Sequence, residues 1–417
     1  MTRITWGFLG LGVILLFAAW SFRDYATLWR GRWRPLPLQP ALSSEGQNGD
    51  WTMWRGNAQR TGVQAQLGPV PRGQVQWQFV NGAGFVSSPI AAGDSLYVGD
   101  TKGRLYRLHR RNGRVIWQLQ ELGPLDSSPA LAGDLLYIGL RDGRLLAIRV
   151  VDGSIRWSFE TGNPIYTSPL VHQGILYISS ADGYVYALDA VNGIERWRAR
   201  TEGWLHSSPA LLDDLVYVGS NDGALYFIDR RTGVTCWHYR TPLAIRATPA
   251  VAEGLVFFGG EDRWFRALDA RTLGGRWTYD WRWVHTTLFI WGITGPPPPL
   301  PGSRWQYRAN GPIVASAAVA HDLVYVASER GTLTALELHT GTPRWSFAAR
   351  KAISASPVVA GEVLYVASYD QTLTALDARH GTLHWQFTAS GPIHATPVVG
   401  DGRVYVAAMD GVVYALQ

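Results

Sequence analysis

The chain has 417 residues and a formal net charge of +6, and its basic excess lies near the N-terminus. Five arginines and one aspartate fall within residues 1–40, which leaves only +2 for the rest of the chain and argues against a surface that tracks nucleic-acid phosphates. The single cysteine, Cys236, excludes an internal disulfide, a Cys-x-x-Cys zinc site and a redox pair, and we expect it to be a small buried side chain within a sheet.

The first element along the chain is an apolar stretch, residues 4–22. It contains 19 residues without a charge, about the length that a helix needs to cross a bilayer core. Trp6 and Trp20 lie near its ends, as interfacial anchors do, and the small-residue cleavage site around residue 20 is poor. We therefore expect residues 1–34 to form an uncleaved membrane anchor with a basic flank.

The orientation of this anchor follows from the arginines on either side of it. One arginine precedes the apolar stretch, and four follow it: Arg23, Arg30, Arg32 and Arg34. The positive-inside rule then predicts that the folded part of the chain lies in the cytoplasm. The family resemblance described below implies the opposite orientation, and both remain open at this point.

Residues 35–73 are predicted to be a linker followed by a tryptophan-containing lead-in. The segment 35–50 is rich in Pro, Ser and Gly and lacks an apolar period, so it is typical of an extended spacer. The segment 51–62 has two tryptophans within four residues. We expect it to lie as a clasp against the rim of the folded domain, before a first strand at about residues 74–79.

A repeat with a period of 40 residues organises the remainder of the chain. The repeat tryptophans are Trp77, Trp117, Trp157, Trp197, Trp237 and Trp277, then, after a gap of 28 residues, Trp305, Trp345 and Trp385. A second marker, usually preceded by Ser or Thr, keeps the same period: Pro89, Pro129, Pro169, Pro209, Pro249, Pro357 and Pro397. A fixed period near 40 residues is typical of propellers and solenoids.

Each repeat unit is predicted to form one four-stranded antiparallel sheet. In residues 127–159, four apolar runs alternate with turn signals such as Asp142-Gly143 and Asp152-Gly153, whose residues readily adopt positive φ. Eight units follow, and the last stops after its third strand. We infer that the strand around Trp77 completes it, so that residues 74–417 form an all-β, eight-bladed β-propeller with no open edge.

The recurring tryptophan needs a structural role in every unit. An indole buries roughly 150–250 Å² and carries one N–H that requires an acceptor. We expect each tryptophan to lie between successive blades, over the turn glycine of its neighbour, and to donate its N–H to a carbonyl there.

An insertion at about residues 278–304 interrupts the repeat. It contains an aromatic half and then a run of four prolines at residues 296–299. Four of its aromatic residues are candidates for contact with a partner or a membrane: Trp281, Trp283, Phe289 and Trp291. The alternative is a flap that folds onto its own blade.

The loops that enter the first strand of each blade gather around one mouth of a propeller's channel. The residue before each Ser/Thr-Pro step varies while its neighbours repeat, which is where a scaffold places specificity. The candidates for binding at this mouth are Asp126, Tyr166, His206, Arg246, Ser354 and His394. Three of them, Asp126, His206 and His394, have side chains that ligate cations or carry protons, and the alternative is a polar channel lining with ordered water.

The repeat resembles the tryptophan-docking motif of the pyrroloquinoline quinone (PQQ) repeat propellers. The copy that matches best consists of Ala187, Asp189, Asn192, Gly193 and Trp197. The resemblance covers residues 51–417 and is specific for the fold, but not for an activity.

Two branches of this family imply different functions. Quinoprotein dehydrogenases hold PQQ and Ca²⁺, typically beneath a disulfide between adjacent cysteines, and this chain lacks any such pair. The chain more closely resembles the outer-membrane assembly factor propellers (BamB type), which are non-catalytic scaffolds, although it has an apolar span in place of their lipid-bearing cysteine.

The resemblance implies a membrane-anchored, non-catalytic scaffold of the bacterial cell envelope, with an extracytoplasmic propeller, envelope protein partners and no cofactor. The main alternative is a PQQ-dependent oxidoreductase with PQQ and Ca²⁺. A third hypothesis is a metal enzyme at Asp126, His206 and His394.

Overall fold

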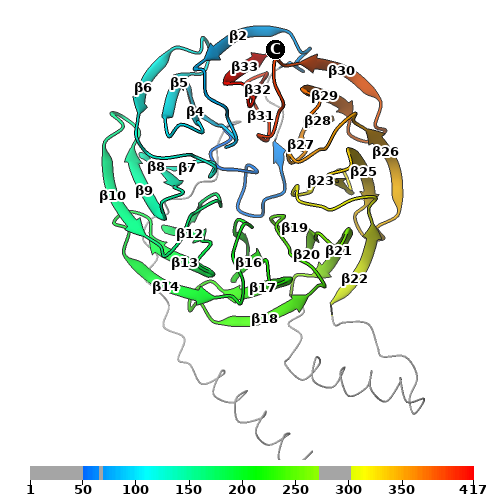
Figure 1. The fold of residues 1–417 in the computed structure, drawn as a ribbon. Coiled ribbons are helices and arrows are strands. Elements are labelled where there is room, and N and C mark those ends of the chain that lie inside the picture. Colours follow the sequence, from blue (N-terminus) through cyan, green and yellow to red (C-terminus); the bar gives the residue numbers. More distant parts are fainter. Residues whose placement is uncertain (1–49, 65–68, 272–301) are drawn as a thin grey trace, which may run out of the picture. The chain divides into compact units, whose positions relative to one another are not determined.

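The computed structural model describes residues 50–64, 69–271 and 302–417. These residues form eight β-sheets arranged radially around one axis (Figure 1). The four strands of each blade pair antiparallel in succession, with the first strand innermost and the fourth outermost. The predicted all-β, eight-bladed propeller is therefore confirmed.

The strands of blades 1 to 4 are β3 (Ile90–Ala92), β4 (Ser95–Gly99), β5 (Leu105–His109) and β6 (Val115–Leu119); β7 (Ala130–Ala132), β8 (Leu135–Gly139), β9 (Arg144–Arg149) and β10 (Ile155–Glu160); β11 (Leu170–His172), β12 (Ile175–Ser179), β13 (Tyr184–Asp189) and β14 (Glu195–Arg200); β15 (Ala210–Leu212), β16 (Leu215–Gly219), β17 (Ala224–Asp229) and β18 (Thr235–Arg240). The strands of blades 5 to 8 are β19 (Ala250–Ala252), β20 (Leu255–Gly259), β21 (Trp264–Asp269) and β22 (Ser303–Arg308); β23 (Ala318–Ala320), β24 (Leu323–Ala327), β25 (Thr332–Glu337) and β26 (Pro343–Ala348); β27 (Val358–Ala360), β28 (Val363–Ala367), β29 (Thr372–Asp377) and β30 (Leu383–Thr388); β31 (Val398–Gly400), β32 (Arg403–Ala407), β33 (Val412–Leu416) and β2 (Val75–Val80).

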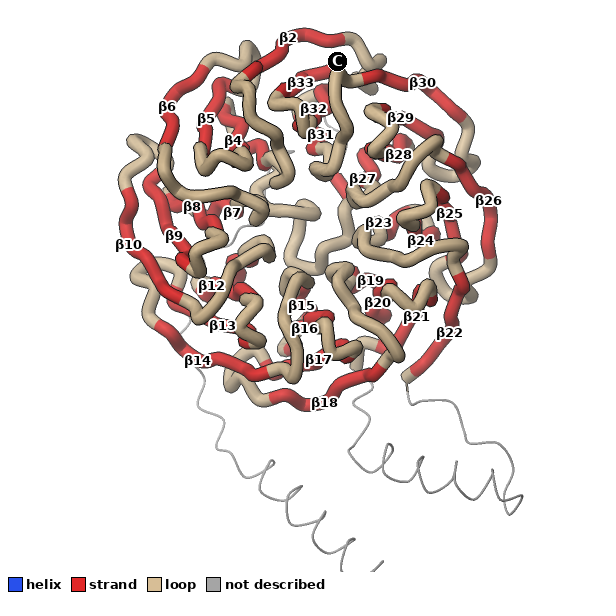
Figure 2. Tube along the Cα trace, in the orientation of Figure 1, coloured by secondary structure: helices blue, strands red, loops and turns tan. Residues whose placement is uncertain are grey.

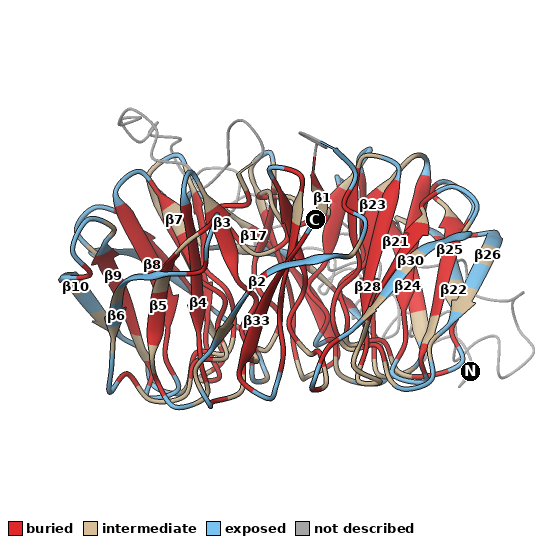
Figure 3. Ribbon diagram, turned by 90° about the horizontal axis from the view of Figure 1, so that it is seen from above, coloured by how far each residue is buried: buried red, intermediate tan, exposed pale blue. Residues whose placement is uncertain are grey.

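The apolar pattern of each strand matches its place in the blade. Second strands such as β4 and β8 are buried at all five positions, because a neighbouring blade covers each of their faces. Fourth strands such as β10 and β26 show one exposed side (Figure 3), and their residues alternate between exposed and half-buried. The core is thus a set of apolar layers between blades.

The two ends of the ring meet in blade 8, as predicted. Strand β2 pairs antiparallel with β33, with Trp77 opposite Ala415. The N-terminal segment also supplies the turn on which blade 7 docks, since the Trp385 indole lies over Gly73 and donates a 2.6 Å hydrogen bond to the Pro71 carbonyl. Closure leaves no blade with a missing outer strand.

Blade 5 differs from the prediction in the position of its fourth strand. The 40-residue period predicts Trp277 in this strand. In the structure the strand is β22, and its Trp305 lies opposite Ala267 of β21. The insertion therefore falls within the turn between β21 and β22, and Ser303 belongs to the blade rather than to the insertion. Trp277 lies outside the described residues.

The repeat tryptophans join successive blades as expected. In blade 3, the Trp197 indole lies over Gly233 of blade 4 and donates a 2.8 Å hydrogen bond to the Arg230 carbonyl. The same bond, to the residue 33 positions later, forms at Trp77, Trp117, Trp157 and Trp305. The turn glycine has positive φ at each of these docking sites, so a side chain there would be strained and would also meet the indole.

The Ser or Thr before each marker proline, together with the equivalent Ser316 of blade 6, forms a second circular connection around the channel. Its hydroxyl accepts a hydrogen bond from the backbone N–H of the equivalent residue in the preceding blade, at 2.8–3.4 Å. The eight members are Ser88, Ser128, Ser168, Ser208, Thr248, Ser316, Ser356 and Thr396. This closed belt explains why Ser or Thr recurs at a position where a hydroxyl must serve as an acceptor.

The lead-in segment lies inside the ring, which corrects the prediction that it clasps the rim. Residues 50–64, here called the plug, cross the centre of the ring (Figures 1 and 2). Plug carbonyls accept hydrogen bonds from first-strand N–H groups in six blades: those of Ala91, Leu131, Leu211, Val251, Val319 and Val359. The plug ends in β1 (Val63–Gln64), which pairs in parallel with β27. It thereby covers edges that would otherwise face the channel unpaired.

Two fully buried arginines hold the plug in place. Arg55 donates to the carbonyls of Pro357 and Ala317, and Arg60 donates to the carbonyls of Pro209, Ser168, Pro169 and Trp54. Burial lowers the pKa of both guanidinium groups to about 9, so both are still charged near neutral pH. Their positive charges are therefore stabilised by carbonyl dipoles from four different blades.

Candidate functional site at the channel mouth

One end of the ring carries the inter-blade loops together with the turns between second and third strands. Backbone hydrogen bonds join the two sets within a blade, from Thr101 to Gly84, from Ala181 to Pro164 and from Asn221 to Trp204. We call this end the mouth face. The opposite end, here called the turn face, carries the first–second and third–fourth turns, which are joined by bonds such as that from Ala190 N–H to the Gly174 carbonyl.

The structure brings the six predicted mouth residues to this face, one from each of blades 2, 3, 4, 5, 7 and 8. They are half-buried, except for Arg246, which is exposed. All six candidates occupy the same position, two residues before the belt member of their blade: Asp126, Tyr166, His206, Arg246, Ser354 and His394. Their contact with a ligand stays a prediction.

Several of these residues bind a partner on the second–third turn of their own blade, 15 positions later. Arg141 forms an ion pair with Asp126, and Glu261 forms one with Arg246 at 3.0 Å. The Asn221 side chain lies 3.4 Å from Nδ1 of His206. These turn residues extend the mouth outward, which the sequence pattern had not indicated.

Blades 2 to 4 share a continuous polar and aromatic row. The Arg141 guanidinium lies 5.9 Å from the centre of the Tyr166 ring, and that ring stacks on His206 with a centroid distance of 5.0 Å and an interplanar angle of 7°. Burial, followed by the positive charge of Arg246, lowers the pKa of His206. The row therefore presents a neutral imidazole near pH 7, available as both donor and acceptor.

His394 forms the corresponding feature on blade 8. It contacts the Tyr369 ring edge to face, with a centroid distance of 5.8 Å. Within the described residues, buried polar atoms of His394, Ser354 and Asp126 have no hydrogen-bond partner: Nδ1, Oγ and Oδ1 respectively. Each can form one more hydrogen bond, so the mouth is able to bind a polar group.

The His394 imidazole should make the stability of the protein depend on pH. Burial lowers its pKa below the ordinary 6.5, although a hydrogen bond to the Val86 backbone and the Asp126 charge act in the opposite direction. The unfolded chain then takes up a proton near pH 6.5 while the folded chain does not, so stability is lost as the pH falls from about 6.5 toward the folded pKa. Urea denaturation between about pH 7.5 and pH 5.5 should show a smaller loss for His394→Gln than for the wild type. Parallel pH curves for the two proteins would contradict this assignment.

Sequence reasoning missed an exposed aromatic residue on the mouth face. Trp204 is 65% exposed, and Leu243, on the next inter-blade loop, is 51% exposed. Both loops border the turn at residues 220–223 of blade 4. A signal was present: Trp204 is off the 40-residue period, at a position where every other blade has Gly, Ala or Pro.

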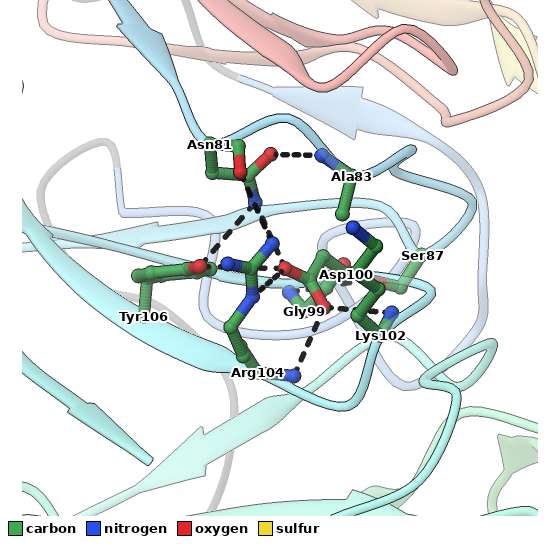
Figure 4. Close-up of polar contacts among 8 residues, drawn as sticks. All are labelled: Asn81, Ala83, Ser87, Gly99, Asp100, Lys102, Arg104 and Tyr106. Atoms are coloured by element: carbon green, nitrogen blue, oxygen red, sulfur yellow. Dashed lines mark hydrogen bonds and ion pairs between the residues drawn. The ribbon is translucent and has the colours of Figure 1, made fainter. Parts of the chain in front are cut away.

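The sequence pattern also did not single out Asp100, a buried carboxylate in blade 1, and its contacts are structural (Figure 4). Asp100 is fully buried and accepts hydrogen bonds from the side chains of Asn81, Arg104 and Tyr106. Its other oxygen accepts the N–H groups of Lys102 and Arg104. Because both of its oxygens are engaged, this carboxylate fixes the mouth loop of blade 1 rather than serving a ligand.

The residues that flank the insertion lie on the end opposite the mouth. These residues, Arg271 and Gly302, belong to the third–fourth turn of blade 5, on the turn face. The candidate aromatic residues lie outside the described residues: Trp281, Trp283, Phe289 and Trp291.

Two further predictions concern Cys236 and metal binding. Cys236 is exposed on β18, not buried, because it precedes the inward-facing Trp237 on an outermost strand. Within residues 50–64, 69–271 and 302–417, no three His, Cys, Asp or Glu side chains form a group able to hold a metal ion. Asp126, His206 and His394 thus do not converge on a single point.

The apolar stretch at residues 4–22 lies outside the described residues. Among the residues that are described, no helix is long and apolar enough to cross a membrane.

Comparison with known proteins separates fold from function. The profile of the family described as outer membrane protein assembly factor BamB matches residues 42–119, 62–170, 119–242, 201–290, 302–393 and 351–417. A comparison with curated protein sequences finds no match.

Solved structures of several kinds share the fold. The chain is similar to BamB from Moraxella catarrhalis, with 19% identity, 82% of this chain and 99% of that chain covered, and a TM-score of 0.67. It is also similar to the quinohemoprotein alcohol dehydrogenase from Comamonas testosteroni, with 14% identity, 89% and 81% covered, and a TM-score of 0.71. The computationally designed Ika8 protein has 16% identity, 83% and 100% covered, and a TM-score of 0.69. Such low identities show the fold alone, whereas the family profile spans most of the chain: the protein belongs to the BamB family of PQQ-repeat β-propellers.

Proposed function

We propose that the protein is a non-catalytic scaffold of the bacterial cell envelope that holds a protein partner at its mouth face. The observation that supports this most directly is the exposure of Trp204 and Leu243 beside a ring of unlike residues. Exposed tryptophan is enriched among the residues that dominate protein–protein binding energies. The variable ring around the channel supplies the polar contacts that give such a surface its specificity.

The family supports an envelope partner. The matching profile is described as an outer membrane protein assembly factor, and a similar structure is BamB from Moraxella catarrhalis. We propose that residues 4–22 anchor the chain as a single-pass span, that residues 35–49 act as a spacer and that the propeller is extracytoplasmic. Protease treatment of intact spheroplasts should then degrade the propeller, whereas a protected propeller would indicate the cytoplasmic orientation.

The oxidoreductase alternative requires residues that hold PQQ and Ca²⁺. Ca²⁺ takes six to eight oxygen ligands. At the mouth, the carboxylates of Asp126 and Glu261 are each engaged by an arginine, and no third carboxylate joins them in the described part of the chain. The plug also fills the channel with buried side chains of its own. These residues do not fit the cofactor.

Photo-crosslinking in producing cells tests the scaffold proposal. Benzoylphenylalanine in place of Trp204 should give a discrete adduct with one partner protein. The same replacement at Val80, equally exposed at 65% but on an outermost strand, should not. Trp204→Ala should weaken recovery of that partner by at least about tenfold, as expected for a dominant contact. Absence of an adduct at both positions would contradict the proposal.

Titration of the purified chain with PQQ and Ca²⁺ distinguishes the alternative. Stoichiometric uptake, followed by the quinone absorbance, would replace the scaffold with a quinoprotein. We expect no saturable binding at the mouth, because Asp126 and Glu261 each pair with an arginine and no group of three metal-ligating side chains forms among the described residues.

A further inference from the structure

The turn face carries exposed apolar side chains on one side of the ring. They lie in the third–fourth turns and at the starts of the fourth strands of blades 1 to 4, and are 44–76% exposed. The six residues, here called the apolar rim, are Val115, Ile116, Val151, Ile155, Ile194 and Val234. Scattered surface apolar residues are normal, but a set that recurs at matching positions in adjacent blades forms a patch.

Tryptophan docking makes these residues neighbours. The Trp117 indole donates to the Val150 carbonyl at 2.8 Å, which brings the exposed Val151 of blade 2 beside the start of β6 in blade 1. The same contact at Trp157 and Trp197 joins blade 2 to blade 3 and blade 3 to blade 4. The apolar rim thus spans four successive blades, with the exposed Arg111 and Arg231 between its members.

The rim is sparser on the other side of the ring, where the exposed large apolar residues at these positions, within the described parts of blades 5 to 8, are Leu383 and Val75. The position of Val151 within its turn is occupied by His339 in blade 6 and by Arg379 in blade 7. The position of Ile194 is occupied by Thr342 and Thr382 in the same two blades. Because equivalent turns accept polar residues without loss of the fold, the apolar side chains of blades 1 to 4 are not required by blade geometry.

The chain that carries the proposed anchor joins the propeller on this face. Asp50, the first described residue, accepts a 3.0 Å hydrogen bond from Gly93 in a first–second turn and pairs with Arg110 in a third–fourth turn. The segment between the anchor and Asp50 is long enough to allow any orientation of the ring, at up to about 3.4 Å per residue. The surface of the propeller itself must then decide which end approaches the bilayer.

We propose that the apolar rim inserts into the interfacial region of the membrane that holds the anchor, so that the mouth face points away from the lipid. This inference rests on the anchor in the proposed function. Exposed arginines at the same level, Arg114 and Arg156, suit this location, since their aliphatic stems cover apolar surface while their guanidinium groups reach lipid phosphates. The rim occupies only one side of the ring, so the propeller rests on the membrane with its axis tilted toward blades 1 to 4.

Site-specific fluorescence on the full chain in vesicles tests this orientation. In a Cys236→Ser background, single cysteines at Val151, His339 and Leu243 are labelled with an environment-sensitive fluorophore. The vesicles contain phosphatidylethanolamine, phosphatidylglycerol and a nitroxide-labelled lipid. Quenching at Val151→Cys should exceed that at Leu243→Cys by about threefold or more, because an interfacial label lies within reach of the nitroxide. His339→Cys, on the polar side of the same face, should give an intermediate value.

Negative charges on the apolar rim should release the propeller from the membrane surface. Val151→Asp with Ile194→Asp is expected to halve the quenching of a label at Ile116→Cys, whereas Val80→Asp, equally exposed near the mouth end of β2, should leave it unchanged. A chain that floats with vesicles but shows equal quenching at Val151 and Leu243 would overturn the rim inference alone. A chain that does not float at all would overturn both the anchor and the rim.

Discussion

Arg60→Ala is expected to lower the free energy of unfolding by about 3 to 5 kcal/mol, because it removes a fully buried guanidinium donor from several buried carbonyl acceptors. The guanidinium group donates to four carbonyls, from blade 3, blade 4 and the plug itself. Loss of the arginine leaves these acceptors buried without donors, at about 1 to 3 kcal/mol each before any water enters. Burial of the Arg60 guanidinium group carries a desolvation penalty, which also lowers its pKa to about 9. Removal of the side chain relieves this penalty, but the relief offsets only part of the lost hydrogen bonding. Urea denaturation followed by tryptophan fluorescence measures the difference.

Arg156→Ala is the matched control, because Arg156 is exposed on the outermost strand β10. It should change stability by less than about 0.5 kcal/mol. Arg60→Lys should recover only part of the loss, since a compact ammonium group cannot span four carbonyls as a planar guanidinium does. If Arg60→Ala unfolded at the same urea concentration as Arg156→Ala, the plug would not be holding the ring together.

Gly233→Ala should destabilise the protein by about 3 kcal/mol, because it combines a backbone penalty with a clash. Gly233 has φ +72°, and a Cβ atom there would lie 2.7 Å from the indole of Trp197. That indole would have to move away from Arg230, whose carbonyl it binds at 2.8 Å. Equilibrium denaturation and the loss of protection of the Trp197 indole N–H from hydrogen exchange report this displacement.

Gly254→Ala separates the two effects. Gly254 has φ +71°, but a Cβ atom there would meet nothing within 4 Å. Its substitution should therefore cost only the left-handed backbone term, about 1 to 2 kcal/mol. Equal destabilisation by the two alanines would mean that the tryptophan contact contributes nothing to the joint between blades.

Most of the ring was predictable because each blade repeats the same physical solution. The tryptophan, the turn glycine and the Ser/Thr before the proline recur, so one interpreted unit applies to eight, and the incomplete last unit indicates closure by the strand around Trp77. Trp277 misled this reasoning, because it continues the period into an insertion. Only the pairing of Trp305 with Ala267 identifies the fourth strand of blade 5.

The candidate site was predictable in position but not in content. The variable residue before the belt marks the mouth in every blade, and the structure places Asp126 and His206 there. Their partners Arg141 and Asn221 lie on turns whose direction depends on strand pairing. The stacking of His206 on Tyr166 is a contact between blades, which no pattern within one repeat contains.

The sequence by itself determined the number of blades, their four-stranded form and the docking role of the tryptophan, because these depend on local propensity and on a period repeated along the chain. The tertiary structure alone decided the location of residues 50–64, which occur once and bind carbonyls of strands up to about 300 residues away. It also decided that Cys236 is exposed and that the turn into which the insertion falls lies on the end opposite the mouth. These features depend on which edges and turns meet in three dimensions, and such meetings leave no period in the sequence.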